Sequence, residues 1–139
     1  MNGNFIWAKR LGGRAEDKGN SLALDAKGNI YITGFFSKIV DFDPENGKFK
    51  LTTQSNYGKF KDVFITKLNT DGIFLWAFQI GGDRDDIGND ISIDVNNNIL
   101  IEGDCYCEID FDIGKGIFFI EPKNGWYGEN AFRLKLNQK

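Results

Sequence analysis

The chain has 139 residues and a mass of 15.7 kDa, which suits one ordinary domain with its own hydrophobic core. The net charge of −3 argues against nucleic acid as the main partner, because phosphate binding needs a basic surface. The sequence contains no histidine, which removes the Ser-His-Asp and Cys-His mechanisms and the commonest metal ligand. No apolar stretch approaches about 18 residues, so we expect no membrane span.

An internal repeat with an offset of 69 residues is the clearest pattern in the sequence. Trp7 opens the phrase WAKRLGG, and Trp76 opens the matching phrase WAFQIGG. From Trp7 to Gly47, 16 of 41 positions are identical to the residue 69 positions later. Beyond Gly47 the offset becomes 68, where DVFITKLN (62–69) matches NAFRLKLN (130–137). The chain therefore consists of two copies of one unit.

Short apolar runs predict four strands in each unit. The runs are rich in Ile, Phe, Val and Leu, and Gly, Asn and Asp separate them, as is typical of strands and turns. In the first unit they are 21–25, 29–36, 62–69 and 72–80, and in the second unit 90–94, 98–103 and 130–137. No window shows the 3.6-residue periodicity of a helix. The predicted fold class is therefore all-β, with two four-stranded antiparallel repeat units of about 69 residues.

The order of the motifs resembles the SBBP-type beta-propeller repeats of bacterial secreted and cell-surface proteins. The matching motifs are Trp before Gly-Gly, Asp-x-Gly, a strand ending in Asp, and then IYITG, DFDP and DVFITKL. The second unit departs from this pattern at the turn positions Asn97, Ile113 and Asn130. The resemblance implies propeller blades in a secreted or cell-surface protein. The opening MNGNFIWAKRLGG has no signal-peptide pattern, so the sequence leaves the localisation open.

The two ends of the chain predict how the blades are divided. Residues 2–11 match residues 71–80, so the chain begins with a fourth strand, and it ends with a third strand. We expect one repeat domain, 1–139, with an outer strand at 1–11, a complete blade at 12–80, and a blade at 81–139 that lacks its outer strand.

Such a chain is expected to need partners, because two blades form no ring and leave apolar faces in water. We expect a homo-oligomer of three or four chains, or a filament, in which Asn130–Asn137 of one copy pairs with Asn2–Leu11 of the next. The alternative is a longer exported propeller, whose other repeats supply the missing strands.

Two Asp-Phe-Asp segments are candidate Ca²⁺ sites, and Ca²⁺ is the one cofactor that the sequence suggests. Asp41 and Asp43 place two carboxylates on one side of an extended segment, and Asp110 and Asp112 repeat the arrangement. Together with backbone carbonyls, such carboxylates bind Ca²⁺. The competing interpretation is that the four carboxylates cap turns.

Three aromatic residues are candidate ligand-binding residues. Tyr57, Trp126 and Tyr127 lie near Gly and Asn in the long connection that follows the second strand of each unit. Such side chains stack on sugar rings, or they cover the edge of a blade. Cys105 and Cys107 are spaced for neither a disulfide on one strand nor a zinc site, so we expect two buried thiols.

These observations leave three functions. The leading hypothesis is a non-catalytic interaction or scaffold module that completes its propeller by strand exchange and has a protein or glycan ligand. The alternative is a carbohydrate-binding, lectin-like module, with or without Ca²⁺. A glycan-cleaving enzyme would need an acid and a nucleophile, and no pair of carboxylates stands out for those roles. We therefore expect that the chain is not an enzyme.

Overall fold

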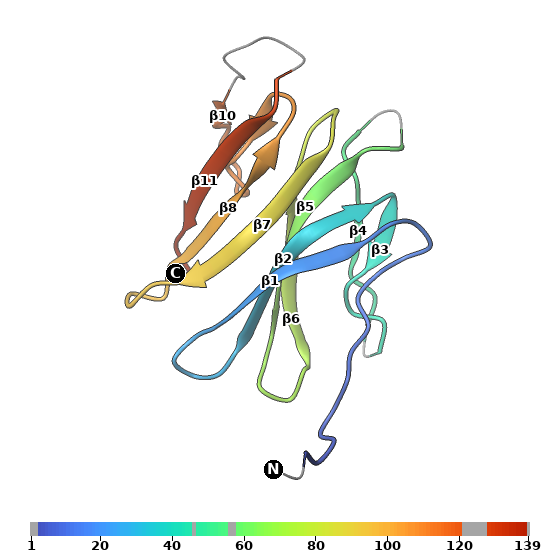
Figure 1. The fold of residues 1–139 in the computed structure, drawn as a ribbon, viewed down its shortest axis with the longest axis vertical. Coiled ribbons are helices and arrows are strands. Elements are labelled where there is room, and N and C mark those ends of the chain that lie inside the picture. The colour runs from blue at the N-terminus through green and yellow to red at the C-terminus, as the bar shows by residue number, and fades with distance from the viewer. Residues whose placement is uncertain (1–2, 46, 56–57, 121–127, 139) are drawn as a thin grey trace.

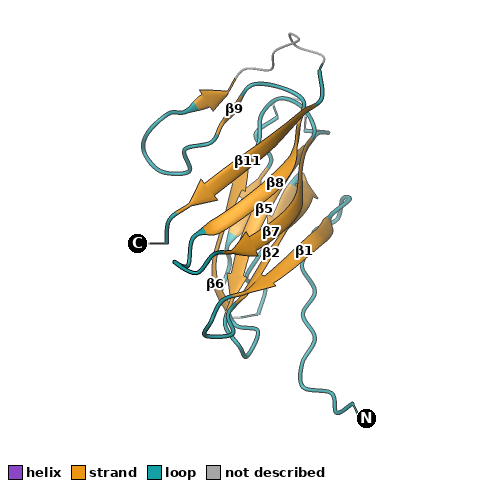
Figure 2. Ribbon diagram, turned by 60° about the vertical axis from the view of Figure 1, so that its left-hand side comes forward, coloured by secondary structure: helices purple, strands orange, loops and turns teal. Residues whose placement is uncertain are grey.

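The computed structural model describes residues 3–45, 47–55, 58–120 and 128–138, and these form strands and loops without a helix (Figure 2). The all-β prediction is therefore confirmed for the described part of the chain, which also holds no helix that could cross a membrane. The strands are β1 (Lys18–Leu24), β2 (Ile30–Ser37), β3 (Ile39–Asp41), β4 (Lys50–Thr52), β5 (Lys61–Leu68), β6 (Phe74–Ile80), β7 (Asp86–Ile93), β8 (Ile99–Cys105), β9 (Ile109–Asp110), β10 (Phe119–Ile120) and β11 (Asn130–Leu136).

The first unit folds into one antiparallel sheet with the order β1-β2-β5-β6. The turn between β1 and β2 shows why these residues form a hairpin. The Asp25 carboxylate accepts hydrogen bonds from the backbone N–H groups of Lys27 and Asn29, both at 2.9 Å. Gly28 takes a φ of 80°, a left-handed conformation that glycine adopts without a steric cost. In the second unit Asn97 takes the same role with a φ of 62°.

The second unit folds into a three-stranded antiparallel sheet with the order β11-β8-β7. β11 pairs with β8 along its whole length, from Asn130 opposite Cys105 to Leu136 opposite Ile99. No described strand pairs with the other edge of β11. The division of the chain into blades that the repeat predicts remains a prediction.

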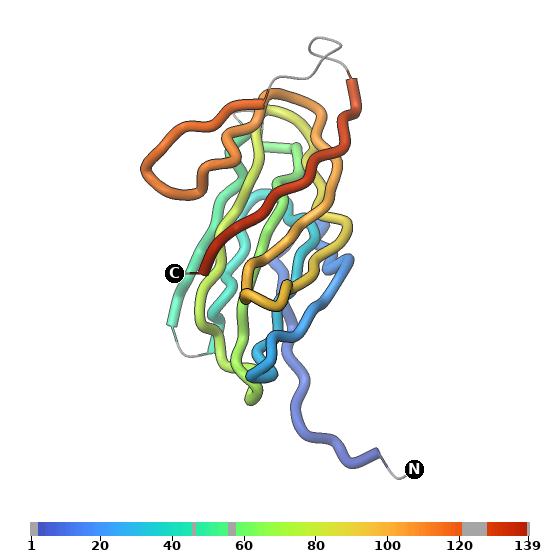
Figure 3. The backbone as a smooth tube through the Cα atoms, turned by 90° about the vertical axis from the view of Figure 1, so that its left-hand side faces the viewer, coloured from blue at the N-terminus to red at the C-terminus, as the bar shows by residue number. Residues whose placement is uncertain are grey.

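Two small hairpins, β3-β4 and β9-β10, were not predicted from the sequence. Each lies in the long connection between the second and third strands of its unit. Their strands have only two or three residues, which is too short for an alternating pattern to stand out. The connection through β9 and β10 projects from the side of the molecule (Figure 3).

The two sheets lie face to face, with β7 next to β1, β2 and β5 (Figure 1). Their shared core comes from both units. It contains Tyr31, Val63, Ile65 and Ile80 from the first sheet, and Ile91, Ile99, Ile101 and Phe132 from the second. Asn20 Nδ2 donates to the Gly88 carbonyl at 2.9 Å, and Ser21 Oγ donates to Asp90 at 2.6 Å, so polar bonds also cross this junction.

The N-terminal segment, residues 3–11, extends away from the two sheets (Figures 1 and 3). It forms no strand within the single chain, although the repeat predicts an outer strand at 1–11. Trp7 rests on the turn at Gly72, and its Nε1 donates to the Thr70 carbonyl at 3.3 Å. Phe5 and Ile6 are 83% and 85% exposed. Pairing of this segment with a neighbouring copy remains a prediction.

Candidate interaction surfaces

The free edge of β11 is the first candidate surface. An unpaired strand edge presents a row of N–H and C=O groups, which is a template for pairing with another strand. Beside the C-terminal end of β11, the rings of Trp76 and Phe78 on β6 stack with centroids 4.9 Å apart. Together with Ile99, Ile113 and Leu136 they line an open recess of about 380 Å³. The edge and this recess together offer hydrogen bonds and apolar surface to an added strand.

The second candidate surface is the side of the first sheet that is turned away from the second sheet, here called the Leu22 face. Leu22 and Leu24 on β1 are 56% and 58% exposed. Their repeat equivalents are Ile91, which is 4% exposed, and Ile93, which packs in the shared core. The first sheet therefore covers this apolar side of the second sheet, whereas the equivalent side of the first sheet remains exposed.

A partly filled recess of about 250 Å³ lies on the Leu22 face. Ile32, Phe36, Val40 and Phe64 line it together with Leu11 of the N-terminal segment. The residues below the recess form a second apolar cluster, in which Phe42 packs edge-on against Phe36 at 5.8 Å. This cluster corresponds, through the repeat, to the residues that the second sheet contributes to the shared core. Phe42, for example, is equivalent to Phe111, which is buried in that core.

The third candidate surface is the outer side of the second sheet, here called the Arg133 face, and it is polar. Arg133 Nε donates to Glu102 Oε1 at 2.8 Å, and Lys135 Nζ lies 2.7 Å from Asp94 Oδ2. Glu102 and Arg133 are directly opposite each other on β8 and β11. Their equivalents in the first sheet are Thr33 and Ile65, which are fully buried in the junction. The outer sides of the two sheets therefore differ in chemistry.

Two fully buried carboxyl groups lie at the junction of the sheets, Asp62 on β5 and Asp86 on β7. Desolvation raises the pKa of Asp62 to about 7, although a hydrogen bond from the Gln54 N–H opposes this shift. Desolvation likewise raises the pKa of Asp86 to about 8, with a smaller contribution from the neighbouring Asp62 charge. Among the described atoms, Asp62 Oδ1 and Gln79 Oε1 are buried without a hydrogen-bond partner.

Asp86 has a structural role that its repeat equivalent, Asp17, shares. Its carboxylate accepts hydrogen bonds from Gly82 N at 2.9 Å and Tyr106 N at 3.3 Å. In the first unit Asp17 accepts from Gly13 N at 2.7 Å and from Ser37 N at 3.1 Å. In both places the carboxylate ties the Gly-Gly loop to the end of the second strand, which is a role in folding.

The Asp-Phe-Asp carboxylates hold the small hairpins together. Asp41 Oδ1 accepts from the N–H groups of Asp43 and Phe49, at 3.1 and 3.0 Å. Asp110 Oδ1 accepts from Asp112 and Phe118 in the same way, at 3.0 and 2.8 Å. These bonds match the turn-capping interpretation. Within the described ranges, no group of three or more His, Cys, Asp or Glu side chains is placed to hold a metal ion, and Ca²⁺ binding stays a prediction.

The candidate sugar-stacking residues, Tyr57, Trp126 and Tyr127, lie outside the described residues. Their role stays a prediction. Cys105 and Cys107 are buried free thiols, as expected, and burial raises the pKa of each to about 11. Thiols in this state are weak nucleophiles, because the thiolate is the reactive form.

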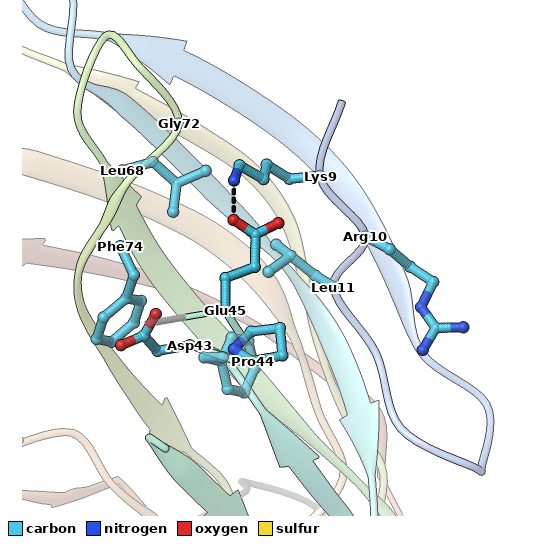
Figure 4. A pocket seen from close by; sticks show the side chains of 10 residues that line it. Lys9, Arg10, Leu11, Asp43, Pro44, Glu45, Leu68, Gly72 and Phe74 are labelled. Carbon is cyan, nitrogen blue, oxygen red and sulfur yellow. Dashed lines mark hydrogen bonds and ion pairs between the residues drawn. The ribbon is translucent and has the colours of Figure 1, made fainter. Parts of the chain in front are cut away.

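A small recess separates the N-terminal segment from the β5-β6 hairpin (Figure 4). Lys9 forms an ion pair with Glu45 across its mouth, whereas Arg10 points away (Figure 4). The recess has a volume of about 30 Å³, which holds about one water molecule and no sugar. This contact therefore anchors the segment and does not form a ligand site.

Comparison with known families agrees with this architecture. Residues 6–34, which reach from the N-terminal segment through β1 into β2, match the family model of the SBBP beta-propeller repeat. The match confirms the resemblance drawn from the motifs.

A relative is the "Uncharacterized WD repeat-containing protein L264" of Acanthamoeba polyphaga mimivirus, which is 24% identical to this chain over 109 residues. The alignment covers 71% of this chain and 8% of the viral protein. The chain thus spans less than a tenth of the length of this relative.

Proposed function

We propose that this propeller-type module is a non-catalytic interaction module that joins copies of itself by strand exchange. The N-terminal segment of one copy adds to the free edge of β11 in another copy and becomes the fourth strand of its second blade. One observation carries the proposal. Among the described residues, the second sheet has three strands and a free edge at β11, and residues 3–11, whose sequence matches a fourth strand, pair with no strand.

The first sheet supplies the register of the proposed pairing. There β5 pairs with β6 so that Val63 is opposite Ile80 and Lys67 is opposite Trp76. Transferred through the repeat, this register places Ala131 opposite Leu11 and Lys135 opposite Trp7. Directly opposed residues in an antiparallel pair have Cα atoms about 4.5–5.5 Å apart, which is within the range that a disulfide spans.

Disulfide trapping between two single-cysteine variants tests this register. Leu11→Cys mixed with Ala131→Cys should give a covalent dimer under mild oxidation on a non-reducing gel. Leu11→Cys mixed with Lys135→Cys is the matched control, since four residues along a strand separate these positions by about 13 Å. The native Cys105 and Cys107 are buried. Equal crosslinking of the two pairs, or none in either, would overturn the proposed pairing.

Carbohydrate binding is the alternative function, and it depends on Tyr57, Trp126 and Tyr127. A glycan array probed with the intact chain, with and without EDTA, tests it. Binding that survives replacement of all three aromatic residues by Ala would remove these residues from the site.

A further inference from the structure

The junction inside the chain shows how one repeat packs on the next. Ile91, Ile101 and Phe132 of the second sheet are buried against the first sheet, where Val63 and Ile65 are fully buried. Gly88 permits the close approach of the sheets. A Cβ atom at this position would collide with Thr33 Oγ1 and would lie 2.9 Å from Val63 Cγ1.

Strand exchange would place the Leu22 face of one copy on the Arg133 face of another, because residues 12–17 connect the exchanged segment directly to β1. Resting on that proposed function, we infer that Glu102 and Arg133 set the strength and selectivity of the contact between copies. The occupant of the Arg133 face is the Leu22 face of a second copy. This contact would be equivalent to the junction within the chain, in which Ile91 takes the place of Leu22.

At two central positions the contact between copies differs from the contact within the chain. Thr33 is replaced by the longer, charged Glu102, and Ile65 is replaced by Arg133. In the free chain Arg133 and Glu102 are exposed and paired with each other. Docking would remove both charges from water, and the desolvation of an ion pair often exceeds its mutual attraction. The contact between copies is therefore weaker than the internal junction.

The two charged residues also make the contact selective. Inside the chain, the Thr33 side chain fits against Gly88. A neighbouring face can dock on the Arg133 face only if it has room for the longer Glu102 side chain at the equivalent place. The equivalent of Gly88 on the Leu22 face is Gly19, where an added Cβ would meet only Ile32 Cγ2, at 3.5 Å. The space above Gly19 is where Glu102 would lie.

The test converts the Arg133 face into the face of the first sheet. The variant carries Glu102→Thr together with Arg133→Ile. Replacing a buried ion pair by apolar residues often stabilises a contact, so assembly should begin at a concentration at least about tenfold lower than for the wild-type chain. Sedimentation velocity over a concentration series measures this, and circular dichroism checks that the variant is folded. The matched control, Glu108→Thr with Lys115→Ile, makes similar changes at exposed positions on another part of the second unit.

A variant with the opposite effect and a variant of the opposing face complete the test. Arg133→Glu places two carboxylates side by side and should weaken assembly. Leu22→Glu, added to the strengthened variant, should abolish assembly. If Leu22→Glu has no effect, the Arg133 face pairs with a surface other than the Leu22 face and the inference is wrong. Assembly that is unchanged in the Glu102→Thr, Arg133→Ile variant, or equally strengthened in the control, also overturns it.

A chain lacking residues 2–11 separates this inference from the proposed function. If the wild-type chain and the strengthened variant assemble at the same concentration, strand exchange is retained and the proposed role of Glu102 and Arg133 is wrong. In another outcome, the wild-type chain stays monomeric and the strengthened variant assembles both with and without residues 2–11. The charged pair then limits docking, and strand exchange is wrong. If no variant assembles, both are wrong.

Discussion

At the scale of single residues, Gly88 and Gly19 occupy equivalent positions in different surroundings. Gly88→Ala should lower the free energy of unfolding by about 1–3 kcal/mol, because the added Cβ collides with Thr33 and Val63 across the junction of the sheets. Gly19→Ala is the matched control, since its Cβ meets only Ile32 at an ordinary distance. Urea unfolding of the two variants measures the difference. Equal losses would mean that the sheets do not approach as closely as described.

The buried carboxyl groups predict a pH dependence of stability. The pKa values of Asp62 and Asp86 are raised to about 7 and about 8 from an ordinary value of 3.8. Between about pH 4 and pH 8 the folded chain therefore holds protons that the unfolded chain has released, and its free energy of unfolding falls as the pH rises. Denaturant unfolding from pH 4 to pH 9 checks this, and Asp86→Asn should flatten the slope. A stability that rises with pH over this range contradicts the assignment.

At the scale of elements, β6 shows how an outer strand is held. Trp76 packs edge-on against Tyr31, with ring centroids 6.0 Å apart, and stacks on Phe78. Trp76→Ala should lower the free energy of unfolding by about 2–4 kcal/mol, less than the largest losses for fully buried tryptophans. Trp7→Ala should change the stability of the single chain less than Trp76→Ala, because Trp7 rests against the turn at Thr70 and Gly72, and it should weaken assembly instead. Thermal unfolding and sedimentation separate the two effects.

The elements differ in how well their sequences predict them. The seven long strands alternate or run continuously apolar between Gly, Asn and Asp turns, so local pattern is enough to identify them. β3, β4, β9 and β10 have only two or three residues each, and their pairing depends on Asp41 and Asp110 holding the loops closed. The N-terminal segment has the sequence of a strand but pairs with no strand in the part of the chain that the structure describes. A strand exists only where a second strand supplies its hydrogen bonds.

At the scale of the whole molecule, the unequal outer faces give the chain a direction. The Leu22 face is apolar and open, whereas the Arg133 face is charged, so copies are expected to join head to tail. Sedimentation of the intact chain should show assemblies of three or four copies at high concentration, which gives the six or eight blades of an ordinary propeller. A chain lacking residues 2–11 should stay monomeric and folded. An intact chain that remains monomeric at every concentration contradicts strand exchange.

The sequence by itself determined the positions and order of the seven long strands, because short apolar runs between turn residues carry that information locally. It also identified Asp17 and Asp86, or Leu22 and Ile91, as equivalent positions. Only the tertiary structure decided that Asp86 and Ile91 are buried, whereas Asp17 is half-buried and Leu22 is exposed. Burial depends on whether another sheet lies across the face, and each unit meets a different neighbour. For the same reason, only the packing of the sheets shows that Glu102 and Arg133 lie on an outer face while Thr33 and Ile65 lie in the junction.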